Sequence, residues 1–179
     1  MRFVRYGLLL VATIGFVGSL GYIAFAPFEA TATGGFAHLS AERIDGSMMS
    51  FAYVDGDILI IDFWGTWCAP CVSEIPHYNA IDREYRDKGV HLIGLTAQSG
   101  EAEEVAEWLE ADESHNITYQ LVMVNDELIN TFGPILGYPT TILIDKDGTI
   151  IKRWIGAGAN KSDRIRELLD KMLAGEPLE

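Results

Sequence analysis

Two continuous apolar runs, with a helical pattern between them, stand out in the middle of the chain. Ile58 to Trp64 lacks an alternation of apolar and polar positions, which is typical of a strand buried on both faces, and only Asp62 interrupts it. Apolar residues then recur at helical spacing from Ser73 to Lys88, and Gly89 ends the predicted helix. Val90 to Thr96 is the second apolar run. The order strand, helix, strand predicts a βαβ unit.

The flanking segments predict further elements of the same sheet. Thr140 to Ile144 and Thr149 to Trp154 are β-rich, and the Asp-Lys-Asp-Gly segment between them predicts a hairpin. A weaker hairpin pattern lies between Arg43 and Tyr53. The remaining predicted elements are a helix over Glu101–Glu113, a strand over Tyr119–Val124, a short helix over Glu127–Phe132 and a closing helix over Lys161–Leu173. We therefore expect an α/β fold with a central mixed β-sheet flanked by helices on both faces.

The N-terminal segment has a different composition. Tyr6 to Phe28 is uncharged and almost wholly apolar, and about 20 such residues span a bilayer core as a helix. A cleaved signal peptide is the alternative, and Ala24 and Ala26 resemble its cleavage site, but its apolar region is usually only about 7–15 residues long. The length therefore favours an uncleaved transmembrane anchor.

The charges beside this segment predict its orientation. Lys and Arg are enriched on the cytoplasmic side, so Arg2 and Arg5 place the N-terminus inside. We expect residues 1–28 to form a cytoplasmic flank and signal anchor, and the small, polar residues 29–35 to form a linker. Residues 36–179 are then a single domain on the outer side of a bacterial cytoplasmic membrane.

Charge and cysteine content exclude several classes of function. The chain has 13 Lys and Arg against 26 Asp and Glu, and an acidic surface repels phosphate backbones, so we expect no nucleic-acid binding. Two cysteines cannot form a disulfide scaffold. The four histidines lack zinc-ligand spacing, and we expect neither a structural metal nor another cofactor.

The two cysteines are the candidate chemistry. Cys68 lies where the buried strand passes into the helix, and a helix N-terminus lowers a thiol pKa from about 8.5 toward neutral or below. Pro70 fits the first helical turn and keeps both sulfurs within bonding distance. We predict a redox disulfide, Cys68–Cys71, in which Cys68 attacks a substrate disulfide and Cys71 resolves the mixed disulfide. A structural disulfide is the alternative, but so small a loop stabilises little.

Resolution requires Cys71 to lose a proton, and two carboxylates are predicted as catalytic acceptors. Asp62 lies in a buried strand, where burial raises a carboxyl pKa toward values suited to proton transfer. A structural role would require a polar partner, because an unpaired buried charge is costly. Glu74 lies three residues after Cys71 on the same helix face, although acids are favourable near any helix N-terminus. The sequence leaves open which of the two accepts the proton.

Aromatic residues beside the cysteines suit substrate contact. Trp64 and Trp67 can belong to the core, but their placement next to the cysteines suits a flat apolar surface for a substrate. An ordinary turn is the default explanation for Pro139, which precedes the strand that begins at Thr140.

These residues resemble a known family. Asp62 to Cys71 (Asp-Phe-Trp-Gly-Thr-Trp-Cys-Ala-Pro-Cys) closely resembles the active-site segment of thioredoxins, and Pro76 matches their helix-kinking proline. Gly137 to Gly148 is similar to the cis-proline loop and adjoining hairpin of that family. The resemblance covers about Phe36 to Leu173. It implies a thioredoxin-like fold, a cis peptide bond before Pro139, and substrate binding by Trp67, Pro70, Tyr138 and Pro139.

A narrower resemblance concerns cellular role. The apolar N-terminal segment, the extra helix and strand between Gly100 and Val124, and Glu74 resemble the TlpA and ResA branch of exported, membrane-tethered reductases. This implies reduction of protein disulfides, such as those of apocytochrome c or copper-site cysteines, with electrons from a membrane donor of the CcdA or DsbD kind. Members of this branch can carry Asn where this chain has Asp62, so the resemblance does not identify the proton acceptor of this chain. Thioredoxins have Gly where this chain has Ala69, so their reduction potential cannot be assigned to it.

Three alternatives compete with a reductase. A disulfide oxidase would use the same residues in the opposite direction. A copper-delivery module would bind Cu(I) through both thiolates, but no Met or His residues cluster near Cys71. A peroxidase does not need a resolving cysteine at this spacing. We therefore predict a thiol-disulfide oxidoreductase that acts as a reductase.

Overall fold

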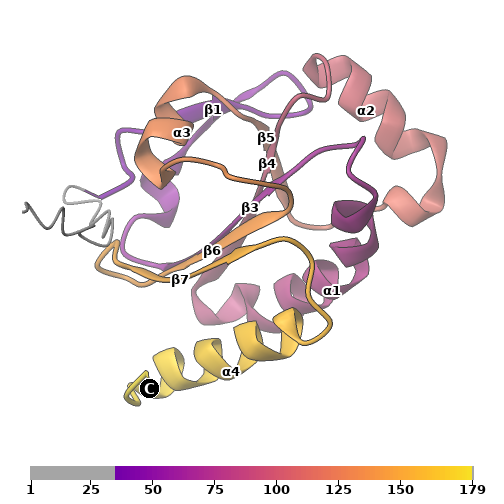
Figure 1. Ribbon diagram of the computed structural model, residues 1–179. Coiled ribbons are helices and arrows are strands. Elements are labelled where there is room, and N and C mark those ends of the chain that lie inside the picture. The colour runs from indigo at the N-terminus through magenta and orange to yellow at the C-terminus, as the bar shows by residue number, and fades with distance from the viewer. Residues whose placement is uncertain (1–34, 179) are drawn as a thin grey trace, which may run out of the picture.

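A five-stranded mixed sheet forms the centre of the computed structural model, which describes residues 35–178 (Figure 1). Its strands are β3 (Ile58–Trp64), β4 (Val90–Thr96), β5 (Gln120–Met123), β6 (Thr140–Ile144) and β7 (Ile150–Ile155), in the order β5-β4-β3-β6-β7. Strands β3, β4 and β5 run parallel, whereas β6 pairs antiparallel with both β3 and β7. The predicted α/β class with a mixed sheet is confirmed.

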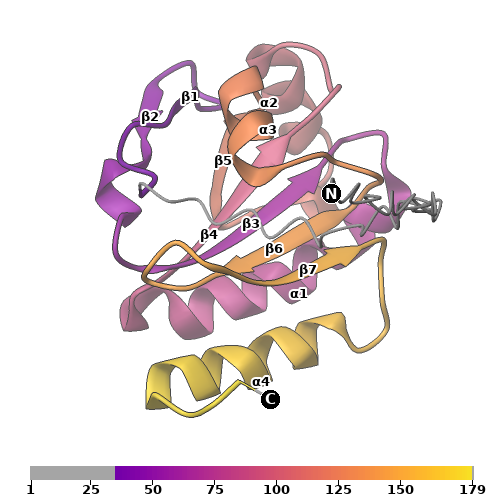
Figure 2. The same cartoon turned by 60° about the vertical axis from the view of Figure 1, so that its left-hand side comes forward.

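Helices and a small hairpin cover the two faces of this sheet. The helices are α1 (Ala69–Tyr85), α2 (Ala102–Ala111), α3 (Asp126–Phe132) and α4 (Lys161–Ala174), and the 3-10 turns are η1 (Phe51–Val54), η2 (Arg86–Lys88) and η3 (Glu113–His115). Helices α1 and α4 lie on one face, and α3 lies on the other with the hairpin of β1 (Ser40–Glu42) and β2 (Met48–Ser50) (Figure 2). Because both faces are covered, every residue of β3 is buried.

The apolar periodicity of α1 begins at Ser73, but the helix itself begins where the cysteine pair was predicted to open it. The helix begins at Ala69, with Cys68 at its N-cap and Pro70 at the second helical position. Proline is accommodated there because the first backbone N–H groups of a helix have no intrahelical acceptor. The apolar periodicity begins later because the first turn carries the cysteine pair rather than a continuous core stripe. The helix then continues through Pro76 to Tyr85.

The pairing of β3 with β6 places two distant segments side by side. Phe63 pairs with Thr140, and Asp62 pairs with Thr141. Since the strands are antiparallel, the loop before β6 lies at the end of β3 from which the chain continues to the cysteines. The register therefore brings Pro139 to the same edge of the sheet as Cys68.

The predicted anchor over residues 1–28 lies outside the described residues, as does most of the predicted linker. Within residues 35–178, no helix is long and apolar enough to cross a membrane.

Candidate active site

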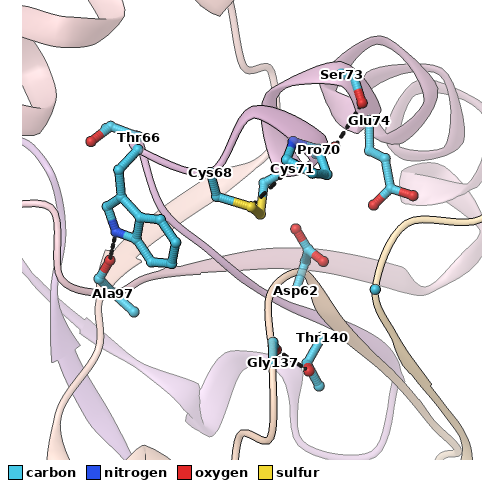
Figure 3. The surroundings of a disulfide bond; sticks show 12 residues. Asp62, Thr66, Cys68, Pro70, Cys71, Ser73, Glu74, Ala97, Gly137 and Thr140 are labelled. Atoms are coloured by element: carbon cyan, nitrogen blue, oxygen red, sulfur yellow. Dashed lines mark hydrogen bonds between the residues drawn. A yellow bond between two sulfur atoms is a disulfide. The ribbon is translucent and has the colours of Figure 1, made fainter.

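Cys68 and Cys71 are joined by a disulfide at the start of α1 (Figure 3), with an S–S distance of 2.01 Å. The Cys68 Sγ atom accepts a hydrogen bond from the backbone N–H of Cys71 at 3.3 Å. In the reduced protein, the same N–H group and the helix dipole would stabilise a Cys68 thiolate. The structure thus contains the predicted disulfide and places Cys68 where a nucleophilic thiolate is favoured.

The cysteine pair is shielded from bulk solvent in this oxidised state. The exposed fractions are 4% for Cys68 and 3% for Cys71, and both residues pack with Trp64 in one apolar cluster. Neighbouring aromatic surface comes from Trp67, which is 52% exposed, and from half-buried Tyr138. The rings of Trp67 and Tyr138 meet edge to face, 5.2 Å apart. A substrate disulfide must therefore fit closely against this surface to reach the sulfurs.

The two tryptophans considered for substrate contact have different positions. Trp67 is exposed, and its Nε1–H donates to the backbone oxygen of Ala97 at 3.2 Å, which fixes the ring. Trp64 is 1% exposed and packs against Trp108, with ring centroids 5.7 Å apart. The expectation that Trp64 contributes to an exposed contact surface is wrong, because its side chain belongs to the core beside the disulfide.

The loop before β6 has the backbone that the family resemblance implies. The Tyr138–Pro139 peptide bond is cis. The Thr140 hydroxyl donates to the Gly137 oxygen at 2.7 Å, and the Gly156 N–H donates to the Pro139 oxygen at 2.7 Å. Pro139 itself is buried, whereas Pro70 is exposed in the first turn of α1. Of the four predicted substrate-binding residues, only Pro139 is therefore withdrawn from the surface in this state.

Asp62 is buried below the disulfide, with its carboxylate directed toward the sulfurs (Figure 3). The hydroxyl of Thr141 on the paired strand donates to its Oδ1 atom at 2.9 Å. Burial raises the pKa of Asp62 to about 7, and nearby Glu74 adds to the rise, whereas Lys161 and the Thr141 hydrogen bond oppose it. A carboxyl group with this pKa can both accept and release a proton near neutral pH.

Glu74 is also buried, and its partner is Lys161. The Lys161 Nζ atom donates to Glu74 Oε2 at 2.6 Å, to Thr141 Oγ1 at 3.2 Å and to the Gly156 oxygen at 3.3 Å. Lys161 is the first residue of α4, where the helix dipole disfavours a cation. The buried ion pair with Glu74, rather than helix stability, accounts for a lysine at this position.

Tyr78 lies between the two carboxylates. Its hydroxyl is 2.7 Å from Thr141 Oγ1 and 3.5 Å from Glu74 Oε2. Burial raises its pKa well above the ordinary value, so the hydroxyl stays protonated. A cavity of about 290 Å³ opens between the starts of α1 and α4 and is lined by Glu74, Tyr78 and Lys161, among other residues.

Three members of this site were not predicted from the sequence: Thr141, Tyr78 and Lys161. Lys161 carried one usable signal, since a lysine at a helix N-terminus is locally unfavourable. Thr141 and Tyr78 carried none, because a Thr in a strand and a Tyr on a buried helix face are both ordinary. Among the described residues, no group of three or more His, Cys, Asp or Glu side chains could hold a metal ion.

A cysteine pair at a helix N-terminus above a buried carboxylate supplies what thiol-disulfide exchange requires: a stabilised thiolate, a resolving thiol and a proton acceptor. Carried on this sheet, it defines a thioredoxin-like thiol-disulfide oxidoreductase. Comparison with known proteins also assigns the chain to a family. Residues 34–153 match the AhpC/TSA family, and the chain belongs to this family.

Two relatives are thiol-disulfide oxidoreductases by name. The thiol-disulfide oxidoreductase ResA of Bacillus thuringiensis is 29% identical over 167 residues, which is 92% of this chain and 91% of that protein. A ResA of Bacillus cereus is 30% identical over 153 residues, 83% of each chain.

Solved structures share the fold. A thioredoxin family thiol:disulfide interchange protein of Chlorobium tepidum has a TM-score of 0.64 at 26% identity, covering 75% of this chain and 92% of that one. StoA of Bacillus subtilis has a TM-score of 0.59 at 23% identity, covering 73% and 95%. These similarities confirm the expected thioredoxin-like fold.

Proposed function

We propose that this oxidoreductase is a membrane-tethered reductase of protein disulfides, with its catalytic domain on the outer side of a bacterial cytoplasmic membrane. The observation that carries the proposal is the position of Asp62 below the Cys68–Cys71 disulfide. Its carboxyl group is buried, and burial raises the pKa of this group to about 7. It offers a proton acceptor where resolution needs one. The uncharged, almost wholly apolar run from Tyr6 to Phe28 supports the tether. We propose residues 1–28 as the anchor, 29–35 as the linker and 36–179 as the catalytic domain.

The proposed cycle has two exchange steps. The Cys68 thiolate attacks a substrate disulfide, forms a mixed disulfide and releases one substrate sulfur as a thiolate. The Cys71 thiol then transfers its proton to Asp62, and its sulfur attacks Cys68 Sγ. The second substrate sulfur leaves, so the substrate disulfide is reduced and the protein dithiol becomes the disulfide seen in the structure.

Substrate and donor are proposed from the family resemblance. The exposed ring of Trp67 and the half-buried ring of Tyr138, together with exposed Pro70, offer an apolar surface for a protein substrate. The Pro139 loop lies at the same edge of the sheet. Suitable substrates are apocytochrome c or the cysteines of a copper site. A membrane protein of the CcdA or DsbD kind would return electrons to the Cys68–Cys71 disulfide.

A trapping experiment in cells tests the proposal. The full-length chain with Cys71→Ser should accumulate mixed disulfides through Cys68, because the resolving thiol is absent. The matched control is Cys68→Ser, which should trap nothing and should reduce no disulfide. If neither variant changes disulfide reduction or captures a partner, the proposed mechanism is wrong. Wild-type protein that stays oxidised in cells while its partners gain disulfides would contradict the reductase direction.

A further inference from the structure

A row of four buried side chains connects the two carboxylates of the site. Asp62, Thr141, Tyr78 and Glu74 have exposed fractions of 2%, 0%, 1% and 7%. The oxygen atoms that link them are separated by 2.9 Å from Asp62 to Thr141, 2.7 Å from Thr141 to Tyr78 and 3.5 Å from Tyr78 to Glu74. The row therefore has a hydroxyl at each of its two inner positions and a carboxylate at each end.

The hydroxyl protons of this row can be arranged in two ways. Thr141 and Tyr78 each have one O–H proton to donate and lone pairs to accept. When Asp62 is ionised, Thr141 donates to Asp62 and Tyr78 donates to Thr141. When Asp62 is protonated, it can donate to Thr141, Thr141 to Tyr78, and Tyr78 to Glu74. Both arrangements use the same oxygen contacts, so the direction of the row can reverse without movement of the backbone.

The two ends of the row have different access to solvent. Glu74 and Tyr78 line the cavity of about 290 Å³ between α1 and α4, whereas the residues that line it do not include Asp62. Lys161 lies at the cavity end, where its Nζ atom contacts both Glu74 and Thr141. A charged ammonium group has no lone pair and cannot accept a proton. Lys161 is therefore a positioning residue that orients Glu74 and Thr141.

We propose that Thr141 and Tyr78 relay the proton from Asp62 to Glu74, from which it leaves into the cavity. This relay rests on the proposed function, in which Asp62 receives the proton of Cys71. The Asp62 proton passes to Thr141 Oγ1, the Thr141 proton to the Tyr78 oxygen, and the Tyr78 proton to Glu74 Oε2. Asp62 becomes a carboxylate, both hydroxyls are unchanged, and Glu74 holds the proton until water accepts it. Asp62 and Glu74 thus accept the proton one after the other and do not compete for it.

The relay can be tested in the oxidised protein without a substrate. The measurement is the rate at which the infrared band of protonated Asp62 disappears after a pH jump from about one unit below its pKa of about 7 to about one unit above. Asp62→Asn assigns the band. Other titratable groups facing Asp62 are Glu74 and Tyr78 from α1, Lys161 from α4 and Tyr119 before β5.

Tyr78→Phe removes one hydroxyl of the row and should slow this deprotonation by about 100-fold, the lower end of what a positioned proton-transfer group contributes. The matched control is Tyr85→Phe. Tyr85 is equally buried on the same helix, but its hydroxyl donates to Asp170, at 2.9 Å, outside the row. The control should deprotonate Asp62 at the wild-type rate. Equal rates in both variants would overturn the relay.

Two further measurements keep the test decisive if Tyr78→Phe does not fold. Thr141→Val should slow the deprotonation, and Thr141→Ser, which retains the hydroxyl, should restore it. The Tyr78 hydroxyl stays protonated, and the Thr141 hydroxyl is neither a strong acid nor a strong base, so the three protons of the row must move together. In the unaltered protein, the rate in mixtures of light and heavy water should therefore curve with deuterium content. A linear dependence would overturn the relay. Failure of the Cys71→Ser trap would instead contradict the proposed function and leave these rates unchanged.

Discussion

The buried carboxylate of Asp62 should make the stability of the oxidised protein depend on pH. The pKa of Asp62 is about 7 in the folded protein, against about 3.9 for an unperturbed Asp in the unfolded chain. Between these values the folded state binds a proton that the unfolded state does not. The free energy of unfolding therefore falls as pH rises from about 4 to about 7, by on the order of 4 kcal/mol, and this contribution is constant at higher pH.

Asp62→Asn removes this dependence. Asn is nearly isosteric with the protonated carboxyl group, and its oxygen can still accept the hydrogen bond from Thr141. Near pH 4 the variant should be about as stable as the wild type. As pH rises from about 4, the free energy of unfolding of the variant should exceed that of the wild type by about 1.4 kcal/mol more for each pH unit. Above pH 7 the difference should level off on the order of 4 kcal/mol.

Denaturant unfolding with the disulfide intact, measured at several pH values, tests this prediction. The two proteins should be compared at equal ionic strength so that screening of surface charges is the same. Asp147→Asn, in the exposed turn between β6 and β7, is the matched control and should follow the pH dependence of the wild type. A stability difference between Asp62→Asn and wild type that stays constant across this pH range would refute the reasoning.

Two further predictions follow from the site. Lys161→Met should destabilise the protein by about 3–5 kcal/mol in denaturant unfolding, because it leaves Glu74 buried without its cation, whereas Arg164→Met, in an exposed ion pair on the same helix, should cost at most about 1 kcal/mol. A similar loss of unfolding free energy in both variants would contradict a larger stabilising role for the buried Lys161–Glu74 pair. Trp67→Ala should raise KM for a protein disulfide about 10-fold or more while changing the reduction of a small disulfide little, because the exposed ring is available to a docked protein. Equal effects on both substrates would exclude a docking role.

Much of the fold followed from local pattern. Strand β3 has the predicted limits Ile58–Trp64, since burial on both faces requires an uninterrupted apolar run. Strands β4 and β6 also have their predicted limits. The predicted hairpin forms between β6 and β7, with Asp145–Gly148 between the two strands. The start of α1 was indicated by the cysteine pair and Pro70 rather than by apolar periodicity, because these residues occupy positions that a core-facing stripe would otherwise mark.

The pair Trp64 and Trp67 shows a limit of local reasoning. Both tryptophans flank the same short turn, and the apolar run that ends at Trp64 predicts its burial but not the residue that covers its ring. Trp64 ends β3, and its ring packs against Trp108 of α2, whereas Trp67 lies beyond that strand and is 52% exposed. The ring that covers Trp64 thus comes from a segment more than forty residues later in the chain.

The sequence by itself determined the cysteine pair and its position at a helix N-terminus, because three residues of spacing and one helical turn are local properties. It also singled out Asp62, since a carboxylate in an apolar run is visible without a fold, and Glu74, since it lies three residues after Cys71 on the same helix face. Only the tertiary structure decided what these carboxylates contact. Thr141 reaches Asp62 across a strand pairing 79 residues apart in sequence, and Lys161 reaches Glu74 from a helix 87 residues away. Such contacts depend on strand register and helix packing, which no local pattern specifies.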